Sequence, residues 1–120
     1  MSRIKKPVIY FNNLAKAPFT DQYVKRRARL IANEILPSKN NLSEISIAIV
    51  DEKTIRQLNK KYRKKNRATS VLTFGNITDD SAEIVLCWNK IHQEAKINGL
   101  KQKDYFFYAL KHGFKNLLKK

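Results

Sequence analysis

The alternation of apolar and polar positions predicts four short strands. The clearest is the run in which Ile45, Ile47 and Ile49 alternate with small or polar neighbours as far as Val50, which is the period of a buried strand. Three further strands are expected at residues 7–11, 70–74 and 82–87, the last two joined by an acidic turn through Asp79 and Asp80.

Apolar residues spaced three and four apart predict four helices. They are expected over residues 21–36, from Asp51 through Tyr62 with Ile55, Leu58 and Tyr62 on the inner face, and over residues 89–97 and 102–118. Thr20 or Asp21 can cap the first helix, and Asn98-Gly99 can end the third. The apolar stripe of the last helix is Phe106, Phe107, Leu110, Phe114, Leu117 and Leu118. The order of elements predicts an α+β fold: one domain over residues 1–120, with a mixed four-stranded sheet packed by about four helices.

The charge of the chain indicates an anionic partner. Twenty-five Lys and Arg against ten Asp and Glu leave a net charge of +15, which makes a compact domain repel itself. A base composition rich in A and T explains Lys in place of Arg, but it does not explain the shortage of acidic residues. Nucleic acid is the favoured partner. The alternatives are an anionic lipid surface, although no apolar stretch reaches the 18 residues of a membrane span, and the absence of any anionic partner.

Cys87 is the only cysteine, which excludes an intrachain disulfide and a zinc cluster built from cysteines. A lone thiol and the lack of a cleavable signal indicate a cytoplasmic protein of the reducing compartment.

The densest positive charge lies between residues 60 and 67, where six of eight residues are Lys or Arg. Arginine grips phosphate with two parallel hydrogen bonds, and lysine adds point charge. A solvated helix end also favours cations because of the helix dipole, but that explains two or three charges rather than six. The expected RNA-binding residues are Lys60, Lys61, Arg63, Lys64, Lys65 and Arg67.

Several blocks of the chain resemble the YbeY family of bacterial endoribonucleases that mature ribosomal RNA. The strand and helix start Ile45-Ser-Ile-Ala-Ile-Val-Asp51 begins the match. The stretch from Tyr62-Arg63-x-Lys65 to Thr69-Ser-Val-Leu-Thr-Phe74 is similar to the family's Tyr-Arg-x-Lys-x-x-x-Thr-Asp-Val-Leu-Ser-Phe. Glu83-Ile84-Val85 resembles its Gly-Asp-Ile-Val strand, and His112-Gly113 resembles the start of its metal motif, His-Gly-x-x-His-Leu-x-Gly-x-Asp-His.

The resemblance implies a mixed sheet with helices on it and a cleft that holds one zinc ion on three histidines. It places the family's essential arginine at Arg63 and implies action at the 3′ end of small-subunit ribosomal RNA. The chain departs from the motif: Asn116 replaces the second histidine, Lys119 replaces a glycine, and the third histidine would fall after Lys120. His112 is then the only retained metal ligand. We expect no zinc at normal affinity, and zinc as the cofactor only if the site is retained in another form.

Two functions follow as hypotheses. In the first, the chain is an RNA-binding protein of ribosomal-RNA maturation, associated with ribosomal RNA or the small ribosomal subunit, with little or no endoribonuclease activity. In the second, it is an active single-strand endoribonuclease in 16S ribosomal-RNA 3′-end processing with a rebuilt or metal-independent site. There His112 would be the catalytic base and Arg63 the cation that stabilises the developing charge. The alternative for His112 is a residual histidine on a helix flank.

Overall fold

The computed structural model of the chain describes residues 6–119. Within them lie four strands and four helices, in the order β1, α1, β2, α2, β3, β4, α3 and α4. The strands are β1 (Val8–Asn13), β2 (Glu44–Val50), β3 (Val71–Phe74) and β4 (Ser81–Cys87). The helices are α1 (Asp21–Ile35), α2 (Glu52–Arg63), α3 (Trp88–Ile97) and α4 (Gln102–Asn116). The predicted α+β fold class is confirmed.

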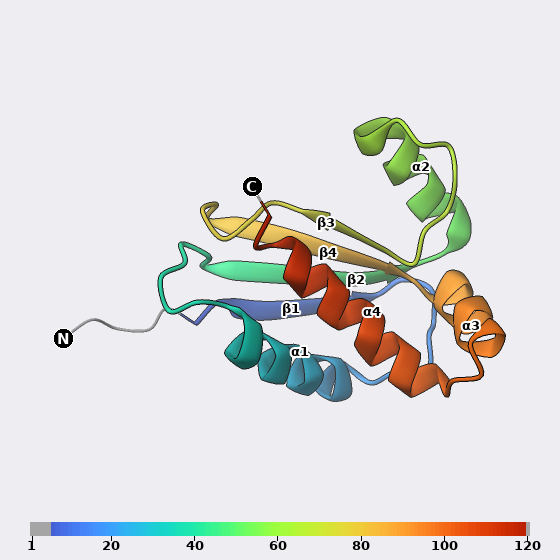
Figure 1. Cartoon of the computed structure of the whole chain (residues 1–120), viewed down its shortest axis with the longest axis horizontal. Coiled ribbons are helices and arrows are strands. Elements are labelled where there is room, and N and C mark those ends of the chain that lie inside the picture. The colour runs from blue at the N-terminus through green and yellow to red at the C-terminus, as the bar shows by residue number, and fades with distance from the viewer. Residues whose placement is uncertain (1–5, 120) are drawn as a thin grey trace.

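The strands form one mixed sheet in the order β1-β2-β4-β3 (Figure 1). β1, β2 and β4 are parallel, and β3 is antiparallel to β4. The alternation seen in β2 has the expected result, because Ile45, Ile47 and Ile49 are all buried on the same face. The short acidic turn between β3 and β4 permits their antiparallel pairing, whereas the parallel pairs are joined by helical crossovers.

Helices α1 and α4 cover one face of this sheet and lie side by side (Figure 1). The main hydrophobic core fills the space between them and the strands, with Ile31 of α1 and Phe106, Leu110 and Phe114 of α4 fully buried. Thr20 is the N-cap of α1: its Oγ accepts a hydrogen bond from the Tyr23 amide at 3.1 Å. The buried residues of α1 and most of the apolar stripe predicted for α4 therefore face the sheet.

Helix α2 packs with the opposite face of the sheet through a second, smaller core. Ile55 is its fully buried anchor. The buried members of this core are Val50, Ile55, Leu72, Val85 and Cys87. The prediction that Tyr62 lies on the inner face is wrong, because Tyr62 is 53% exposed. The helix rises past β3 in Figure 1, so its last turn leaves the core, and the Tyr62 ring rests edge-on against Phe74 with centroids 5.3 Å apart.

The two C-terminal helices meet at the predicted turn. Asn98 is the C-cap of α3, and Gly99 follows with φ +66°, a left-handed conformation that glycine adopts without a Cβ penalty. Helix α4 ends at Asn116 rather than at the predicted residue 118. Leu117 is still buried, but Leu118 is 41% exposed and lies outside the apolar stripe.

Cys87 is buried at the end of β4, as expected, and burial raises the pKa of its thiol. Across residues 6–119, no helix combines the length and the apolar character that crossing a membrane requires.

Candidate nucleic-acid interface

A hollow of about 590 Å³ lies where the end of α2, the basic loop that follows it (residues 64–67), β3 and the end of α4 converge. We call it the cleft. Its cations are Arg63, Lys65, Arg67 and Lys119, and its other lining residues are Asn59, Thr69, Val71, Leu72, Thr73, Gly75, Asn76 and Asn116. No carboxylate is among the lining residues drawn from the described chain. The cleft therefore presents donors and positive charge, which suits an anion.

The basic loop is fixed to α2 by a buried amide. Asn59 is 3% exposed, and its Nδ2 donates a hydrogen bond to the Arg67 carbonyl at 2.9 Å. Its own carbonyl accepts from the Lys65 amide at 3.2 Å. Lys64, which precedes Lys65, is the C-cap of α2 and adopts the left-handed conformation with φ +59°. The loop thus has a defined path, and Lys65 and Arg67 are carried to the cleft.

Arg63, the last residue of α2, is oriented by the neighbouring strand. Its Nη2 donates to the Thr73 carbonyl at 2.6 Å, and its guanidinium lies 5.3 Å from the centre of the Phe74 ring. The hydrogen bond occupies one N–H and the ring supports one face of the planar group. The remaining N–H donors are held at the cleft in a fixed plane, the arrangement that bidentate phosphate binding requires.

Close packing of α4 on the sheet forms the opposite wall of the cleft. A Cβ at Gly113 would lie 2.7 Å from Ile84 Cγ2 and 3.1 Å from Val71 Cγ2, so only glycine allows this approach. The Gly113 carbonyl accepts a hydrogen bond from Thr73 Oγ1 at 2.9 Å, a buried link between helix and strand. One turn later, Asn116 reaches the cleft, and its Oδ1 is buried without a hydrogen-bond partner among the residues described.

The lining residues of the cleft in the described chain include no histidine, cysteine or carboxylate, which are the side chains that usually bind zinc. Asn116, where the resemblance places the family's second ligand, shares the cleft with cations such as Arg63 and Lys119, which repel a dication. His112 is exposed on α4 and is not one of the residues that line the cleft. Within residues 6–119, no group of three His, Cys, Asp or Glu side chains comes close enough to hold a metal ion.

The predicted site residues are divided by the fold. Arg63, Lys65 and Arg67 are brought together at the cleft. Lys60 lines a different hollow on the outer flank of α2, while Lys61 and Lys64 are exposed and line neither. The pairing of His112 with Arg63 in one site remains a prediction.

Sequence reasoning missed two buried polar residues that build the cleft, Asn59 and Thr73. Asn59 lies four residues after Ile55, on the apolar stripe of its helix, and a polar residue at such a position signals a satisfied structural hydrogen bond. For Thr73, alternation predicts only that it faces one side of β3, and the available signal was the family stretch, where a serine, also a hydroxyl residue, stands at this position.

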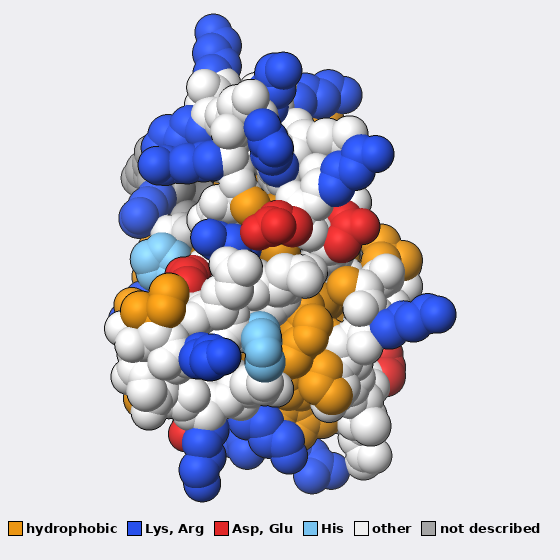
Figure 2. Space-filling view, turned by 90° about the vertical axis from the view of Figure 1, so that its right-hand side faces the viewer, with side chains coloured by type: hydrophobic (Ala, Val, Ile, Leu, Met, Phe, Trp, Pro, Cys, Tyr) orange, Lys and Arg blue, Asp and Glu red, His pale blue; other side chains and the backbone are white. Residues whose placement is uncertain are grey.

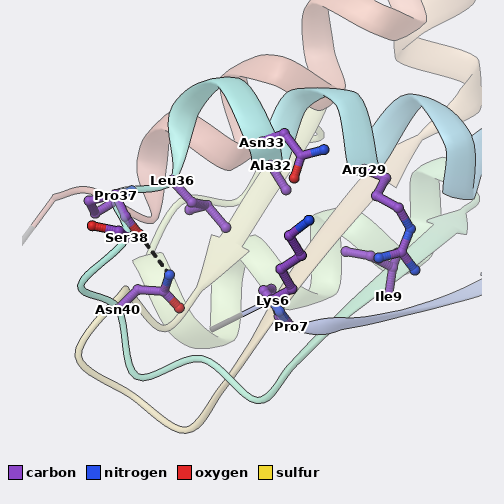
Figure 3. Close-up of a pocket in the computed structure, with 10 residues that line it drawn as sticks. All are labelled: Lys6, Pro7, Ile9, Arg29, Ala32, Asn33, Leu36, Pro37, Ser38 and Asn40. Carbon is purple, nitrogen blue, oxygen red and sulfur yellow. Dashed lines mark hydrogen bonds between the residues drawn. The ribbon is translucent and has the colours of Figure 1, made fainter. Parts of the chain in front are cut away.

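A separate hollow of about 370 Å³ lies between α1 and the start of β1 (Figure 3). Lys6 and Arg29 line it over Ile9. The loop beside it closes on itself, since the Asn40 amide donates to the Pro37 carbonyl at 2.8 Å. This hollow contains two cations and none of the residues of the basic loop, so the cleft is the stronger candidate.

Comparisons with known proteins identify the family of the chain. The family profile described as YbeY, endoribonuclease YbeY, matches residues 10–118. The proteins named endoribonuclease YbeY from Ureaplasma urealyticum and Mycoplasmopsis synoviae are each 31% identical over 88% and 98% of this chain, and the matches cover 73% and 74% of those proteins. The one from Bdellovibrio bacteriovorus is 28% identical over 88% of this chain and 75% of its own length. The match to the Albidiferax ferrireducens protein covers about half of that relative, 49%.

The fold has a solved counterpart. A solution structure of a protein from Thermotoga maritima superposes with a TM-score of 0.64 over 92% of this chain and 71% of that one, at 20% sequence identity. At that identity the likeness concerns the fold alone. Because the family profile spans nearly the whole chain, the chain belongs to the YbeY family of endoribonucleases.

Proposed function

We propose that the chain binds RNA in the cleft and acts in the maturation of ribosomal RNA at the small ribosomal subunit, in the cytoplasm. One observation carries the proposal: four cations converge on a single hollow that has no carboxylate in its described lining. The relatives' name, endoribonuclease, supports an RNA substrate. The family resemblance points to the 3′ end of small-subunit ribosomal RNA.

Arg63 is the residue we propose for the central phosphate contact. Its guanidinium is already oriented by Thr73 and Phe74, so little side-chain entropy is lost when phosphate binds. Lys65, Arg67 and Lys119 contribute point charge or additional donors around it. The polar groups of Asn76 and Asn116 can bind ribose hydroxyls or base edges, since an amide both donates and accepts.

A second candidate function is cleavage of the bound RNA, favoured by the name that the relatives share. In a metal-independent route the ribose 2′-hydroxyl attacks the adjacent phosphate while a base takes its proton. A 2′,3′-cyclic phosphate forms, and the 5′-oxygen of the next nucleotide leaves as a hydroxyl after it takes up a proton from the protonated base or from water. Arg63 would stabilise the developing charge. His112 would be the base, which requires the bound RNA to reach across α4, because this side chain is exposed outside the cleft lining.

Titration of a fluorescent single-stranded RNA that copies the small-subunit 3′ end tests the proposal. We expect saturable binding whose affinity falls steeply as salt rises, because phosphate contacts release counterions. Absence of saturable binding at ordinary salt would overturn it. Cleavage of the same RNA with and without chelator, together with the metal content of the purified protein, separates the functions. Stoichiometric zinc with chelator-sensitive cleavage would mean that the chain has a functional metal site, whereas chelator-insensitive cleavage that is lost in His112→Ala supports the metal-independent route.

A further inference from the structure

A second basic hollow lies on the outer flank of α2. It measures about 790 Å³, and we call it the outer groove. Lys53, Arg56 and Lys60 enter it from α2 at spacings of three and four, the spacing that places side chains on one face of a helix. Arg67 of the basic loop and Lys90 of α3 line it from two other segments.

The charge of the outer groove is poorly balanced by the protein itself. Its described lining residues include one carboxylate, Glu52, and five cations. The salt bridges of the described chain join Lys25 to Asp21 and Lys111 to Glu34, so none of these five cations takes part in one. Lys and Arg side chains crowd the upper part of the space-filling view, where α2 lies (Figure 2). Cations held together in this way repel one another unless an anion neutralises them.

Part of the groove is ordered for binding. Arg56 Nε donates to Asn66 Oδ1 at 2.9 Å, which ties the guanidinium to the basic loop and leaves its other N–H groups for a ligand. The long stems of Lys53 and Lys60 keep their ammonium groups in solvent, where they act as point charges along the helix. A planar donor beside spaced point charges suits a chain of phosphates better than a single small anion.

Arg67 connects this groove to the cleft, because it lines both hollows. We infer that the outer groove is a second binding segment for single-stranded RNA, which holds the phosphate backbone of the strand after it leaves the cleft across Arg67. This inference rests on the proposed function and extends it, since it gives the RNA a path and a minimum length. The cations of the outer groove would then bind the part of the RNA strand that lies beyond the cleft.

RNA length distinguishes the two segments. We compare an RNA of about three nucleotides with one of about 12, inside the range of roughly 4–16 that single-strand-binding folds cover. The groove variant is Lys53→Gln/Lys60→Gln/Lys90→Gln. Its matched control, Lys39→Gln/Lys96→Gln/Lys101→Gln, removes the same charge at exposed positions away from both hollows.

We expect the groove variant to bind the longer RNA about tenfold more weakly and to lower the salt slope by about 2, while its affinity for the short RNA is unchanged. The control should change neither length appreciably. Equal weakening of the longer RNA by both variants would overturn the inference, because bulk charge would then explain it. If the unaltered chain binds neither RNA, the proposed function itself fails.

Amide NMR shifts of the unaltered chain provide a check that does not depend on how the variants fold. The longer RNA should shift residues on the outer face of α2, such as Gln57 and Lys60, and the short RNA should not. Shifts confined to the cleft with both RNAs would overturn the inference.

Discussion

The guanidinium of Arg63 donates a 2.6 Å hydrogen bond to the Thr73 carbonyl, which joins the end of α2 to the edge strand β3. Lysine at position 63 keeps the charge but loses the planar fork. We expect Arg63→Lys to weaken RNA binding about tenfold, in line with ~1.5–3 kcal/mol for a hydrogen bond to a charged group. Fluorescence titration with RNA measures it.

Lys119→Ala is the matched variant, since it removes a cation from the same cleft without an oriented hydrogen bond. Its effect on RNA affinity should be smaller than that of either Arg63→Lys or Arg63→Ala. Equal losses for all three would mean that the cleft attracts RNA by charge alone.

Asn59 is predicted to hold the basic loop. Asn59→Ala removes the donor to the Arg67 carbonyl and leaves that group unpaired beside α2. We expect the free energy of unfolding to fall by about 1–3 kcal/mol and RNA affinity to fall with it. Urea denaturation measures the first quantity. Gln57→Ala, an exposed substitution on the same helix, should stay within about 0.5 kcal/mol of the unaltered chain. An Asn59→Ala protein of unchanged stability would contradict the role.

Gly113→Ala should destabilise the protein even though alanine favours helices over glycine by about 1 kcal/mol. The new Cβ would lie 2.7 Å from Ile84 Cγ2, in a core that has no space for it, and overpacking of this kind costs about 1–3 kcal/mol. We therefore expect a net loss in urea denaturation, whereas Lys115→Ala at an exposed site of the same helix stays near neutral. A stabilised Gly113→Ala protein would show that α4 moves freely on the sheet.

Stability should depend on acid pH through Asp51, the N-cap of α2. Hydrogen bonding from Thr54, including its amide at 2.8 Å, lowers the pKa of the Asp51 carboxyl below its ordinary value of 3.8. A lowered folded-state pKa means that the contribution is present above the unfolded value and is lost as the pH falls through the folded one. Asp51→Asn caps without charge, so its melting temperature should fall less steeply below about pH 4. Parallel slopes for the two proteins would refute this.

Local pattern was sufficient to predict most of the fold. The alternation around Ile47 and the stripe through Phe106 and Phe114 each depend on one face being buried, and burial imposes that period on the sequence. The pattern overextended at Tyr62, because its spacing continues the stripe past the buried part of the second core, to a position beside Phe74 of the edge strand where the ring is largely exposed. Periodicity gives the phase of a helix but not where its neighbour stops.

The candidate site was only partly accessible from sequence. The positive charge of the run from Lys60 to Arg67 can be read directly from the sequence. Which of its residues line the cleft and which line the outer groove depends on how α2 lies against β3. Lys90 is remote in sequence and joins the outer groove only because α3 packs with α2. Packing has the opposite effect on His112 and keeps it out of the cleft. Gly113 and Phe114 take the sheet-facing positions of α4, so His112 is exposed.

Cys87 makes the molecule convenient for site-specific labelling. The chain's only thiol is fully buried, and its raised pKa keeps it protonated at neutral pH, so maleimide reagents meet an unreactive group while the protein is folded. A cysteine introduced at an exposed position such as Lys60 or Lys96 would carry the fluorophore alone, with the native residue left in place. Energy transfer from such a dye to labelled RNA would then trace where a strand lies on the protein surface.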